Sequence, residues 1–382
     1  MFHLGVIGFG LRAQTMAAAM LATGEEVCFS AICDPDEQAA YDFFQKHALK
    51  GPPNFVPDLD ALLQVPGLDG ILLGTRCNLH AVFASKILAR GIPLFLEKPV
   101  AITLPELQQL EDVANKYPCA VTVSFPLRLT ALCQKMKKIL DSGEIGDITQ
   151  VQAYNNVPYG GVYYHSWYRD EALTGGLFLQ KATHDLDYLH YLLGQYPTKV
   201  FALESKQYYK GRKPAGLRCE QCAERKTCRE SDWLLLQESA ETVHGPWCCF
   251  AQDVGNHDSA SVLMQYANGM HSVYTQNFVA KKGAAKRGAR FIGTEGTAEF
   301  DWYSEKIQLW KHYSTDVTVI TCPEDQLHGH SGGDHLLALD FFQVLRGEAS
   351  QSDLRSGINS ARLCLKAKES ARTHQFLNVF DI

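Results

Sequence analysis

Residues 4–13 read LGVIGFGLRA, an apolar run that ends in two glycines separated by one residue. Gly8, Gly10 and Ala13 match the G-x-G-x-x-A fingerprint of a strand-to-helix turn that binds a dinucleotide. Gly8 permits the tight turn, and Gly10 lacks the Cβ that would block a pyrophosphate. The phosphates then lie on free N–H groups at the start of a helix. The fingerprint alone is a common pattern, so its meaning depends on the residues around it.

The surrounding residues alternate between short apolar runs and amphipathic stretches. This is typical of βαβ units with helices on both faces of a parallel sheet. The predicted strands cover residues 4–7, 27–33, 70–73, 93–96 and 120–124, and the predicted helices lie around 12–22, 36–47, 79–90 and 104–116. The fingerprint thus has a strand before it and a helix after it. We predict an NAD-binding Rossmann domain over residues 1–125.

An acidic residue follows the second predicted strand. Asp34 lies 24 positions after Gly10, where a carboxylate accepts hydrogen bonds from a ribose diol and repels a 2′-phosphate. No arginine follows Asp34 closely, so NAD is favoured over NADP. A turn that binds no ligand, with Asp34 as a helix cap, is the alternative. The predicted cofactor contacts at this turn are Gly8, Phe9, Gly10, Leu11, Arg12 and Asp34.

Beyond about residue 148 the pattern changes to stretches in which apolar and polar residues alternate, as in an antiparallel sheet with one open face. One long helix is predicted at 176–193, residues 205–255 form an insertion rich in cysteine and charge, and two helices lie within 334–373. The predicted strands are 151–154, 261–266, 270–274 and 289–292. We predict an α+β domain over residues 126–382 with a large, mainly antiparallel, open-faced sheet. An exposed apolar sheet face favours a homo-dimer or homo-tetramer.

The composition excludes several classes of protein. The 36 basic residues are outnumbered by 42 acidic ones, so no global positive field attracts nucleic acid. No apolar run approaches the roughly 20 residues needed to cross a bilayer. The first apolar stretch runs directly into Gly8, which leaves no room for a signal peptide. We expect a cytoplasmic protein whose 12 cysteines are thiols or metal ligands before they are disulfides.

Four of these cysteines lie in the insertion at a spacing that suggests a metal. Cys219 and Cys222 form a C-x2-C pair, which Cys228 and then Cys248 follow. Such a set in a reducing compartment is typical of a structural zinc site. The spacing matches no standard zinc finger, so an iron–sulfur cluster and unligated thiols stay open as alternatives.

Five further motifs occur in order along the chain. They are GTRCNLH at 74–80, EKP at 97–99, GEIG at 143–146, GGLFLQKATHDLD at 175–187 and GTEG at 293–296. With them the chain resembles the Gfo/Idh/MocA oxidoreductase family, which includes glucose–fructose oxidoreductase and inositol dehydrogenase, over nearly its whole length. Arg76 and Cys77 depart from the family's usual T-P-N segment, and Gln180 stands where the family often has aspartate.

The resemblance implies a role for each matching position. Lys98 would lie beside the nicotinamide and hydrogen-bond the hydroxyl being oxidised, and His184 would take or return the proton of that hydroxyl. Pro99 would fix the loop through a cis peptide bond. The remaining implied cofactor contacts, of which Asn78 and His80 would border the nicotinamide, are Thr75, Asn78, His80, Glu97 and Lys98.

Gln180 and Lys181 are the other predicted catalytic residues. Gln180 cannot ionise, so it can orient the substrate or His184 but cannot relay a proton. On a helix, Lys181 and Gln180 lie three and four positions before His184, so all three can face one cavity.

Aromatic and polar side chains in residues 159–169 suit a carbohydrate ring, which has apolar faces and a rim of hydroxyls. Ordinary packing is the alternative for this segment. The predicted substrate contacts are Lys98, Tyr164, Trp167, Arg169, Gln180, Lys181 and His184. Arg128 is a weaker candidate. A later loop, with His328, His330 and Asp334, either closes over the substrate or caps the helix that follows.

These observations favour an NAD-dependent oxidoreductase that transfers a hydride between nicotinamide and a secondary hydroxyl of a sugar, cyclitol or related polyol. One alternative is a redox-assisted glycosidase or lyase that keeps NAD tightly bound. Another is a non-catalytic sensor that binds NAD. The presence of both Lys98 and His184 argues against the sensor.

Overall fold

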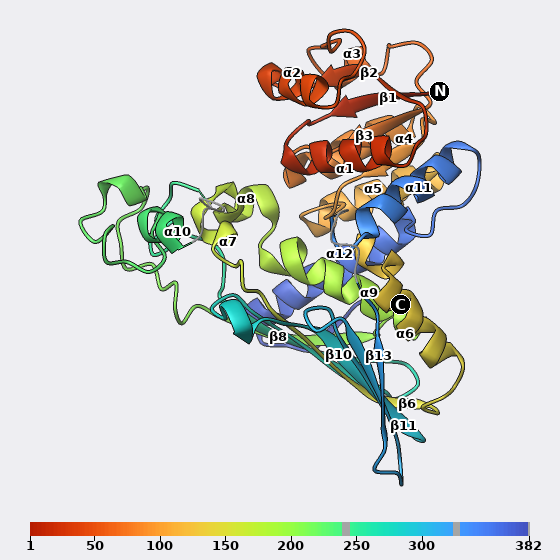
Figure 1. Ribbon diagram of the computed structural model, residues 1–382, viewed down its shortest axis with the longest axis vertical. Helices are drawn as coiled ribbons and strands as arrows, with labels where there is room; N and C mark the ends of the chain where they lie inside the picture. Colours follow the sequence, from red (N-terminus) through yellow and green to blue (C-terminus); the bar gives the residue numbers. More distant parts are fainter. Residues whose placement is uncertain (239–244, 324–328, 381–382) are drawn as a thin grey trace. The chain divides into compact units, whose positions relative to one another are not determined.

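The computed structural model describes residues 1–238, 245–323 and 329–380. These residues divide into two compact units (Figure 1). The first comprises Met1–Lys137, Leu186–Leu192 and Pro323–Arg362, and the second comprises Lys138–Asp185, Leu193–Cys322 and Leu363–Ile382. The division is therefore not a single cut near residue 125, because two later segments return to the first unit. No helix in the described parts is both long and apolar enough to cross a membrane.

The first unit contains a five-stranded sheet in the order β2-β1-β3-β4-β5, and every pair of neighbouring strands is parallel. The strands are β1 (Phe2–Ile7), β2 (Val27–Cys33), β3 (Gly70–Leu73), β4 (Leu94–Leu96) and β5 (Val121–Val123). The helices between them are α1 (Leu11–Ala22), α2 (Glu37–Lys46), α3 (Leu59–Leu62), α4 (His80–Leu88) and α5 (Leu104–Lys116). The predicted Rossmann architecture is confirmed.

Helices cover both faces of this sheet. On one face, Leu4, Val6 and Phe95 of the strands pack in one apolar cluster with residues of α1, α2 and the later helix α11 (Gly333–Leu345). On the other face, α4 packs against α5 and contacts β3 and β4. Figure 1 shows α11 lying beside α1. The core of the first unit thus includes a helix that is more than 300 residues distant from α1 in the chain.

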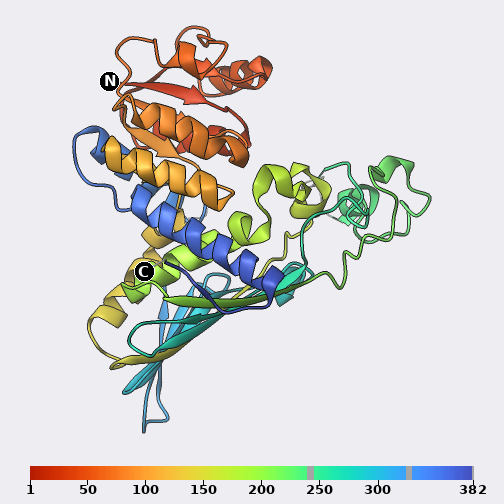
Figure 2. The same cartoon turned by 180° about the vertical axis from the view of Figure 1, so that it is seen from behind.

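The second unit contains a large sheet, which Figure 2 shows from behind. Its nine strands are in the order β13-β12-β11-β10-β6-β9-β8-β7-β14. Within this sheet, β6–β9 is the only parallel pair among the described strands. The strands are β6 (Ile148–Asn156), β7 (Lys199–Ser205), β8 (Ser259–Gln265), β9 (His271–Asn277), β10 (Lys286–Gly293), β11 (Gly296–Asp301), β12 (Lys306–Lys311), β13 (Val317–Thr321) and β14 (Leu377–Asn378). Burial alternates along β8, where Val262 is fully buried and Leu263 is 38% exposed. The predicted open-faced sheet is confirmed, and the homo-oligomer stays a prediction.

The remaining helices include a π-helical turn at the start of the predicted long helix. Gly175 and Gly176 have φ angles of +76° and +91°, a left-handed conformation that side-chain-bearing residues avoid. The chain then forms a π-helical turn over Phe178–Ala182 before α9 begins. The other helices are α6 (Ala131–Asp141), α7 (Val162–His165), α8 (Glu171–Thr174), α9 (Thr183–Leu193), α10 (Asp232–Glu238) and α12 (Leu354–Thr373). Such π turns occur frequently at functional sites.

A buried ion pair joins the 186–192 segment to the rest of the first unit. The Arg128 side chain donates two hydrogen bonds to the Asp187 carboxylate, one of them at 2.9 Å from Nε to Oδ2. Both side chains are almost fully buried. Arg128 is therefore an anchor inside the first unit. The Asp187 carboxylate occupies guanidinium donors of Arg128 that were expected to contact substrate.

Candidate functional site

The two glycines of the fingerprint, Gly8 and Gly10, differ in how much space surrounds the position of a Cβ atom. Gly8 has a φ angle of +77°, and a Cβ built there would lie 2.5 Å from the backbone nitrogen of Thr75. Gly8 is therefore required by the fold itself. A Cβ built on Gly10 would meet no atom within 4 Å. Gly10 precedes α1 as its N-cap residue and provides no side-chain cap, so the space in front of the helix start is open.

Asp34 lies beside this turn at the end of β2. Its carboxylate accepts hydrogen bonds from the backbone N–H of Phe9 at 2.5 Å and of Asp36 at 2.8 Å. A carboxylate has about four lone-pair sites, so capacity remains for the two hydroxyls of a ribose. The Phe9 side chain is buried against Phe43, and Phe9 contributes only its backbone here.

The segment after β3 contains a buried acceptor that no donor satisfies. Asn78 lies in the 3₁₀ turn Cys77–Leu79, and its side-chain oxygen has no hydrogen-bond partner among the described residues. An orphaned buried oxygen costs about 1–3 kcal/mol, so it is a candidate to accept a hydrogen bond from a ligand. Thr75, whose hydroxyl donates to the backbone oxygen of Arg76, lies in the same segment.

His80 has a different role from the one expected. Its ring is 1% exposed, and its two nitrogens lie 2.8 Å from the carbonyl oxygen of Pro99 and 3.1 Å from that of Thr75. Burial lowers the pKa of His80, which favours the neutral ring. His80 thus connects the Thr75 segment to the Pro99 loop and presents no polar atom toward a ligand.

Lys98 follows β4 and is half-buried. The Lys98–Pro99 peptide bond is cis, as the resemblance implied. The preceding residue, Glu97, is 4% exposed. Its carboxylate accepts a hydrogen bond from Arg12 Nε at 2.9 Å, so Glu97 holds the loop and does not present a free carboxylate to a cofactor.

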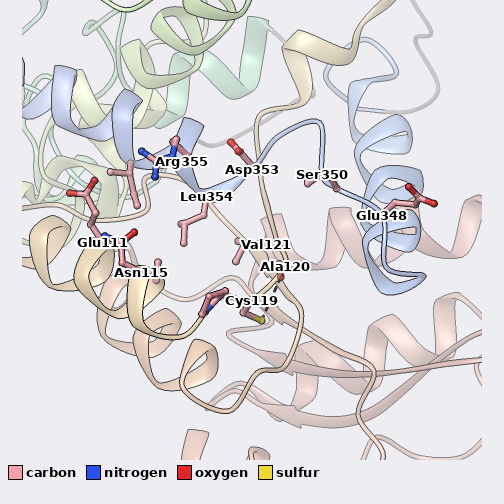
Figure 3. A pocket seen from close by; sticks show the side chains of 14 residues that line it. Glu111, Asn115, Cys119, Ala120, Val121, Glu348, Ser350, Asp353, Leu354 and Arg355 are labelled. Carbon is pink, nitrogen blue, oxygen red and sulfur yellow. Dashed lines mark hydrogen bonds between the residues drawn. The ribbon is translucent and has the colours of Figure 1, made fainter.

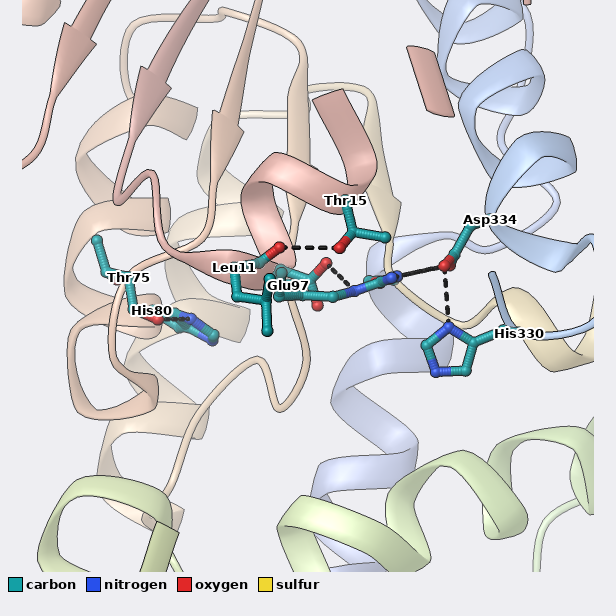
Figure 4. A network of polar contacts seen from close by, with 9 residues as sticks. Leu11, Thr15, Thr75, His80, Glu97, His330 and Asp334 are labelled. Carbon is teal, nitrogen blue, oxygen red and sulfur yellow. Dashed lines mark hydrogen bonds and ion pairs between the residues drawn. The ribbon is translucent and has the colours of Figure 1, made fainter. Parts of the chain in front are cut away.

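Arg12 is the centre of a network of charged side chains in the first unit. Figure 4 shows three other members of the network, Glu97, Asp334 and His330. Besides Glu97, the Arg12 guanidinium donates two hydrogen bonds of 2.7 Å to the Asp334 carboxylate and one of 2.9 Å to the Ser124 hydroxyl. His330 Nδ1 lies 3.0 Å from the same carboxylate. Arg12 was predicted as a cofactor contact, but two carboxylates already neutralise its charge. It joins the glycine turn, the Glu97 loop and the start of α11.

The loop before α11 therefore acts as part of this network. Gly332 has a φ angle of +80° and stands at the N-cap of α11, and Asp334 in the first turn is 1% exposed. These observations favour the helix-capping interpretation of the loop. His328 lies outside the described residues.

The residues of the first unit fit a dinucleotide. The open space at Gly10 and the uncapped start of α1 suit a pyrophosphate, and Asp34 suits a ribose diol. The unsatisfied oxygen of Asn78 suits a further donor. The open space at Gly10 and the unsatisfied oxygen of Asn78 do not stabilise the fold by themselves, which is why a ligand is their natural explanation.

In the second unit, Lys181 and Tyr159 form a buried contact. Lys181, in the π-helical turn, is 4% exposed. Its ammonium donates a hydrogen bond to the Tyr159 hydroxyl and lies 4.6 Å from the centre of the tyrosine ring. His184, one turn later, is 7% exposed. Gln180 is 2% exposed and donates a hydrogen bond of 3.0 Å to the carbonyl oxygen of Thr174.

Asp185 anchors the start of α9 to the sheet of the second unit. Arg287 of β10 donates to Asp185 Oδ1 at 2.7 Å. Asn155 of β6 and Tyr274 of β9 donate to Oδ2 at 2.6 and 2.7 Å. Both oxygens of this fully buried carboxylate are therefore in use, which fixes the helix that carries Lys181 and His184.

Two of the predicted substrate contacts, Tyr164 and Arg169, are buried side chains. Tyr164 is fully buried, donates a hydrogen bond of 2.7 Å to the carbonyl oxygen of His257, and stacks on Tyr209. Arg169 is 5% exposed and pairs with Asp253 at 2.6 Å. Trp167 stacks on its neighbour Tyr168 and stays partly exposed. Packing explains Tyr164, because a buried and satisfied side chain offers nothing to a substrate. Arg169 differs, since its Nε and Nη1 are buried without a hydrogen-bond partner among the described residues.

The predicted metal site finds no support. Cys219, Cys222, Cys228 and Cys248 line one very small cavity together with His165. However, no group of three or more His, Cys, Asp or Glu side chains within the described ranges is arranged to hold a metal ion. Burial raises the pKa of Cys219 to about 11 and raises that of Cys228 and Cys248 as well. Burial therefore favours the protonated thiol at these three positions, and Cys228 and Cys248 also contribute to an apolar cluster as small hydrophobic groups.

Two hollows in the first unit lie away from most of the predicted residues. One of about 360 Å³ lies beside β5, and Figure 3 shows Glu111, Cys119 and Arg355 among the side chains that line it. No predicted site residue lines this cavity. The other, of about 660 Å³, runs along α1 and α2 and includes Leu11, whose side chain is 83% exposed.

Sequence reasoning missed Tyr159 as an individual residue, although it stands in the aromatic segment 159–169. Its partner Lys181 is 22 positions away, and no local pattern marks the pair. The link from Arg12 to Asp334 spans 322 positions, and only the order of the two segments in the folded chain brings them together.

Two family models match this chain, each over a different part of its length. The model described as an oxidoreductase family with an NAD-binding Rossmann fold matches residues 2–125. The GFO/IDH/MocA C-terminal domain matches residues 133–299. The two matches cover most of the chain and meet near the change of pattern noted in the sequence.

Named proteins are similar over large parts of the chain. An oxidoreductase of Bacillus subtilis, YteT, is 26% identical over 330 residues, which is 76% of each chain. Inositol 2-dehydrogenase of Pseudomonas fluorescens is 30% identical over 192 residues, which is 50% of this chain and 54% of that one. The solved structure of levoglucosan dehydrogenase with NADH and levoglucosan has a TM-score of 0.79 at 19% identity and covers 99% of both chains. The last similarity concerns the fold.

The Arg12 network predicts how stability depends on pH. Burial by itself raises the pKa of Asp334, but the charge of Arg12 and the contact with His330 outweigh burial and hold it well below its usual value. A carboxylate with a depressed pKa stabilises the folded state above its unfolded pKa of about 4 and loses that contribution as the pH falls. We expect the urea midpoint of the wild type to fall between about pH 5 and pH 3.

The Asp334→Asn variant should show a smaller slope over the same range, because it has no proton to bind at this position. Asp60→Asn is the matched control, since the ion pair of Asp60 with Lys86 is exposed and contributes little. Equal slopes for wild type and Asp334→Asn would contradict the assignment.

Proposed function

Because the chain belongs to the Gfo/Idh/MocA oxidoreductase family, we propose that it is an NAD-dependent dehydrogenase acting on a secondary hydroxyl of a sugar, cyclitol or related polyol. The observation that carries this proposal is Gly10. A side chain there would touch no protein atom, so packing does not require a glycine. A pyrophosphate passing in front of α1 does require one.

The names of the relatives support a substrate with several hydroxyl groups. Inositol dehydrogenases occur among the similar sequences, and levoglucosan dehydrogenase has a similar fold. The half-buried aromatic residue Trp167 and the polar groups of the π-helical turn are of the types that bind carbohydrate rings. The particular polyol is decided by loop geometry that a family does not fix.

The cofactor would be held by groups of the first unit. The N–H groups at the start of α1 would bind the pyrophosphate, and Asp34 would accept hydrogen bonds from the adenosine ribose. The Asn78 oxygen would accept a hydrogen bond from the nicotinamide half. When bound, the nicotinamide supplies the group that accepts or returns a hydride.

Lys98 and His184 are proposed to act on the substrate hydroxyl. The Lys98 ammonium would donate a hydrogen bond to the oxygen and stabilise the negative charge that develops there. The His184 imidazole can donate or accept a hydrogen bond and is proposed to contact the substrate hydroxyl. Asp185 keeps the helix of His184 in place through its contacts with Arg287.

A panel of cyclitols, monosaccharides and glycosides, incubated with NAD and the wild-type protein, tests this proposal. Net formation of NADH with a free polyol is the expected result. Release of an aglycone without net NADH would instead identify a redox-assisted glycosidase or lyase. Absence of both reactions would leave the sensor as the remaining interpretation.

With the best substrate of that panel, Lys98→Met should lower kcat at least about 100-fold, because general acid–base and charge stabilisation contribute factors of this size. Binding of NAD, followed by calorimetry, should change little. Lys86→Met is the matched control, since Lys86 forms an exposed pair with Asp60, and it should keep wild-type activity. Full activity of Lys98→Met would refute the role of Lys98.

Asp34 predicts the choice of cofactor. A carboxylate at the ribose repels a 2′-phosphate, and a charged hydrogen bond contributes about 1.5–3 kcal/mol, which corresponds to roughly 10- to 100-fold in binding. We expect kcat/KM for NAD to exceed that for NADP, and Asp34→Asn to reduce the ratio at least about tenfold.

Asp36→Asn is the control for this variant because it removes the same charge two residues away. Asp36 caps α2 through the N–H of Ala39, and asparagine keeps that ability. If the two variants change the ratio equally, Asp34 has no specific contact with the ribose.

A further inference from the structure

Lys181 is a buried cation without a carboxylate partner. Within the described residues, no acidic side chain forms an ion pair with it, and its ammonium donates to the Tyr159 hydroxyl. Asp185, whose charge acts on Lys181, has both carboxylate oxygens engaged by Arg287, Asn155 and Tyr274. A buried charge is costly unless it is paired or hydrogen-bonded. The phenol oxygen of Tyr159 is the group that compensates it.

This arrangement acts on the protonation of Tyr159. Burial by itself raises the pKa of the phenol, but the charges of Lys181 and Arg287 and the hydrogen bond from Lys181 outweigh burial. The pKa of Tyr159 is therefore lowered. Burial, as the largest cause, also lowers the pKa of Lys181. Both shifts move the pKa of a group that can exchange protons closer to neutral pH, where such a group is most effective in catalysis.

Tyr159 is also accessible and held in place. It follows β6 in the short connection to α7, and 42% of the residue is exposed. A Cβ built on the next residue, Gly160, would lie 2.6 Å from the carbonyl oxygen of Phe278, so this connection packs closely against the chain after β9. Lys181 thus contacts the phenol oxygen of a tyrosine that is partly exposed to solvent.

We propose that the Tyr159 hydroxyl exchanges a proton with the substrate hydroxyl, and that Lys181 is the positioning residue that holds it. This inference rests on the proposed dehydrogenase function and sharpens it. In the oxidation direction, the substrate O–H bond would break and its proton would pass to the phenolate oxygen of Tyr159, forming the phenol O–H bond. A bound oxidised nicotinamide would supply the acceptor for the hydride of the C–H bond. The carbonyl product forms, and the reverse direction returns the proton.

The proposal gives the proton to Tyr159 and leaves His184 as a hydrogen-bonding partner of the substrate. The charged and titratable groups that face Tyr159 come from several elements. They are Lys181 of the π-helical turn, Asp185 of α9, Arg287 of β10, Tyr163 of α7 and Tyr303 after β11. Of these, only Lys181 is hydrogen-bonded to the phenol oxygen in the described contacts.

The first measurement needs neither cofactor nor substrate. The ultraviolet difference spectrum of the protein during a pH titration reports the ionisation of its 16 tyrosines. We expect one tyrosine of the wild type to ionise below the others. That transition should be absent in Tyr159→Phe, move to higher pH in Lys181→Met, and persist in Lys181→Arg, which keeps the charge. Tyr313→Phe is the control, because Tyr313 is fully exposed.

The second measurement is the pH profile of kcat with the best polyol. Tyr159→Phe should lower kcat about 100-fold or more with little change in KM. Lys181→Met should move the pH limb of kcat to higher pH, in parallel with its spectroscopic transition. His184→Asn should keep the position of that limb, because in this proposal the limb belongs to the phenol.

The outcomes distinguish a failure of the proton-exchange proposal for Tyr159 from a failure of the proposed dehydrogenase function. If the wild type oxidises a polyol and Tyr159→Phe does so at the same rate, the proton-exchange proposal is overturned and the dehydrogenase stands. If the pH limb of kcat moves in His184→Asn instead, the substrate proton is exchanged with the His184 imidazole, and the proposal for Tyr159 is overturned. If no polyol yields NADH although the low-pH tyrosine transition is present, the proposed function fails and the proton-exchange proposal fails with it.

Discussion

The guanidinium of Arg12 donates hydrogen bonds to Glu97, Ser124 and Asp334, and so joins the glycine turn to three segments that are far apart in the chain. These segments are the loop that carries Lys98, the end of β5 and the start of α11. Both carboxylates are almost fully buried. Removing one partner of such a buried pair typically costs about 3–5 kcal/mol. The geometry of the proposed cofactor site therefore depends on this charged contact more than on any single apolar residue.

In the second unit, two buried charges, those of Asp185 and Lys181, differ in how completely their neighbours compensate them. At Asp185 a buried carboxylate meets Arg287 and two further donors, so the group is fully compensated and serves to fix α9. Four residues earlier, at Lys181, the hydrogen-bond partner of the buried charge among the described residues is a phenol. Compensated charges hold a structure in place, whereas an incompletely compensated one changes the protonation of its neighbour. The contrast between these adjacent groups distinguishes an anchor from a chemically active pair.

Much of the first unit could be predicted because its determinants are local. The buried parallel strands are continuous apolar runs, and β2 and β3 begin and end at the predicted residues. The glycine turn and the acid at Asp34 are local patterns as well. The return of α11 to this unit could not be predicted, because it depends on contacts such as that between Arg12 and Asp334, which are 322 positions apart.

The second unit shows where residue type misleads. Tyr164 and Tyr159 belong to one aromatic segment, yet the first is fully buried and the second is 42% exposed. Composition cannot distinguish a core aromatic from one that faces solvent. The cysteines of the insertion have a spacing that favours zinc, but their arrangement is that of buried thiols. The π-helical turn also changes the phase of side chains around Lys181, which a regular helical period does not anticipate.

The central claim is that a nicotinamide dinucleotide lies in front of α1, and calorimetric titration with NADH of wild type and Gly10→Asp tests it most directly. Gly10 has an extended N-cap conformation with open space around it. An aspartate there should cap the helix and keep or raise stability. Its carboxylate would occupy the N–H groups that the phosphates need. We expect saturable binding to the wild type and at least about 100-fold weaker binding to the variant, with no loss in thermal midpoint. Equal binding by the two proteins, or no saturable binding by the wild type, would contradict the account.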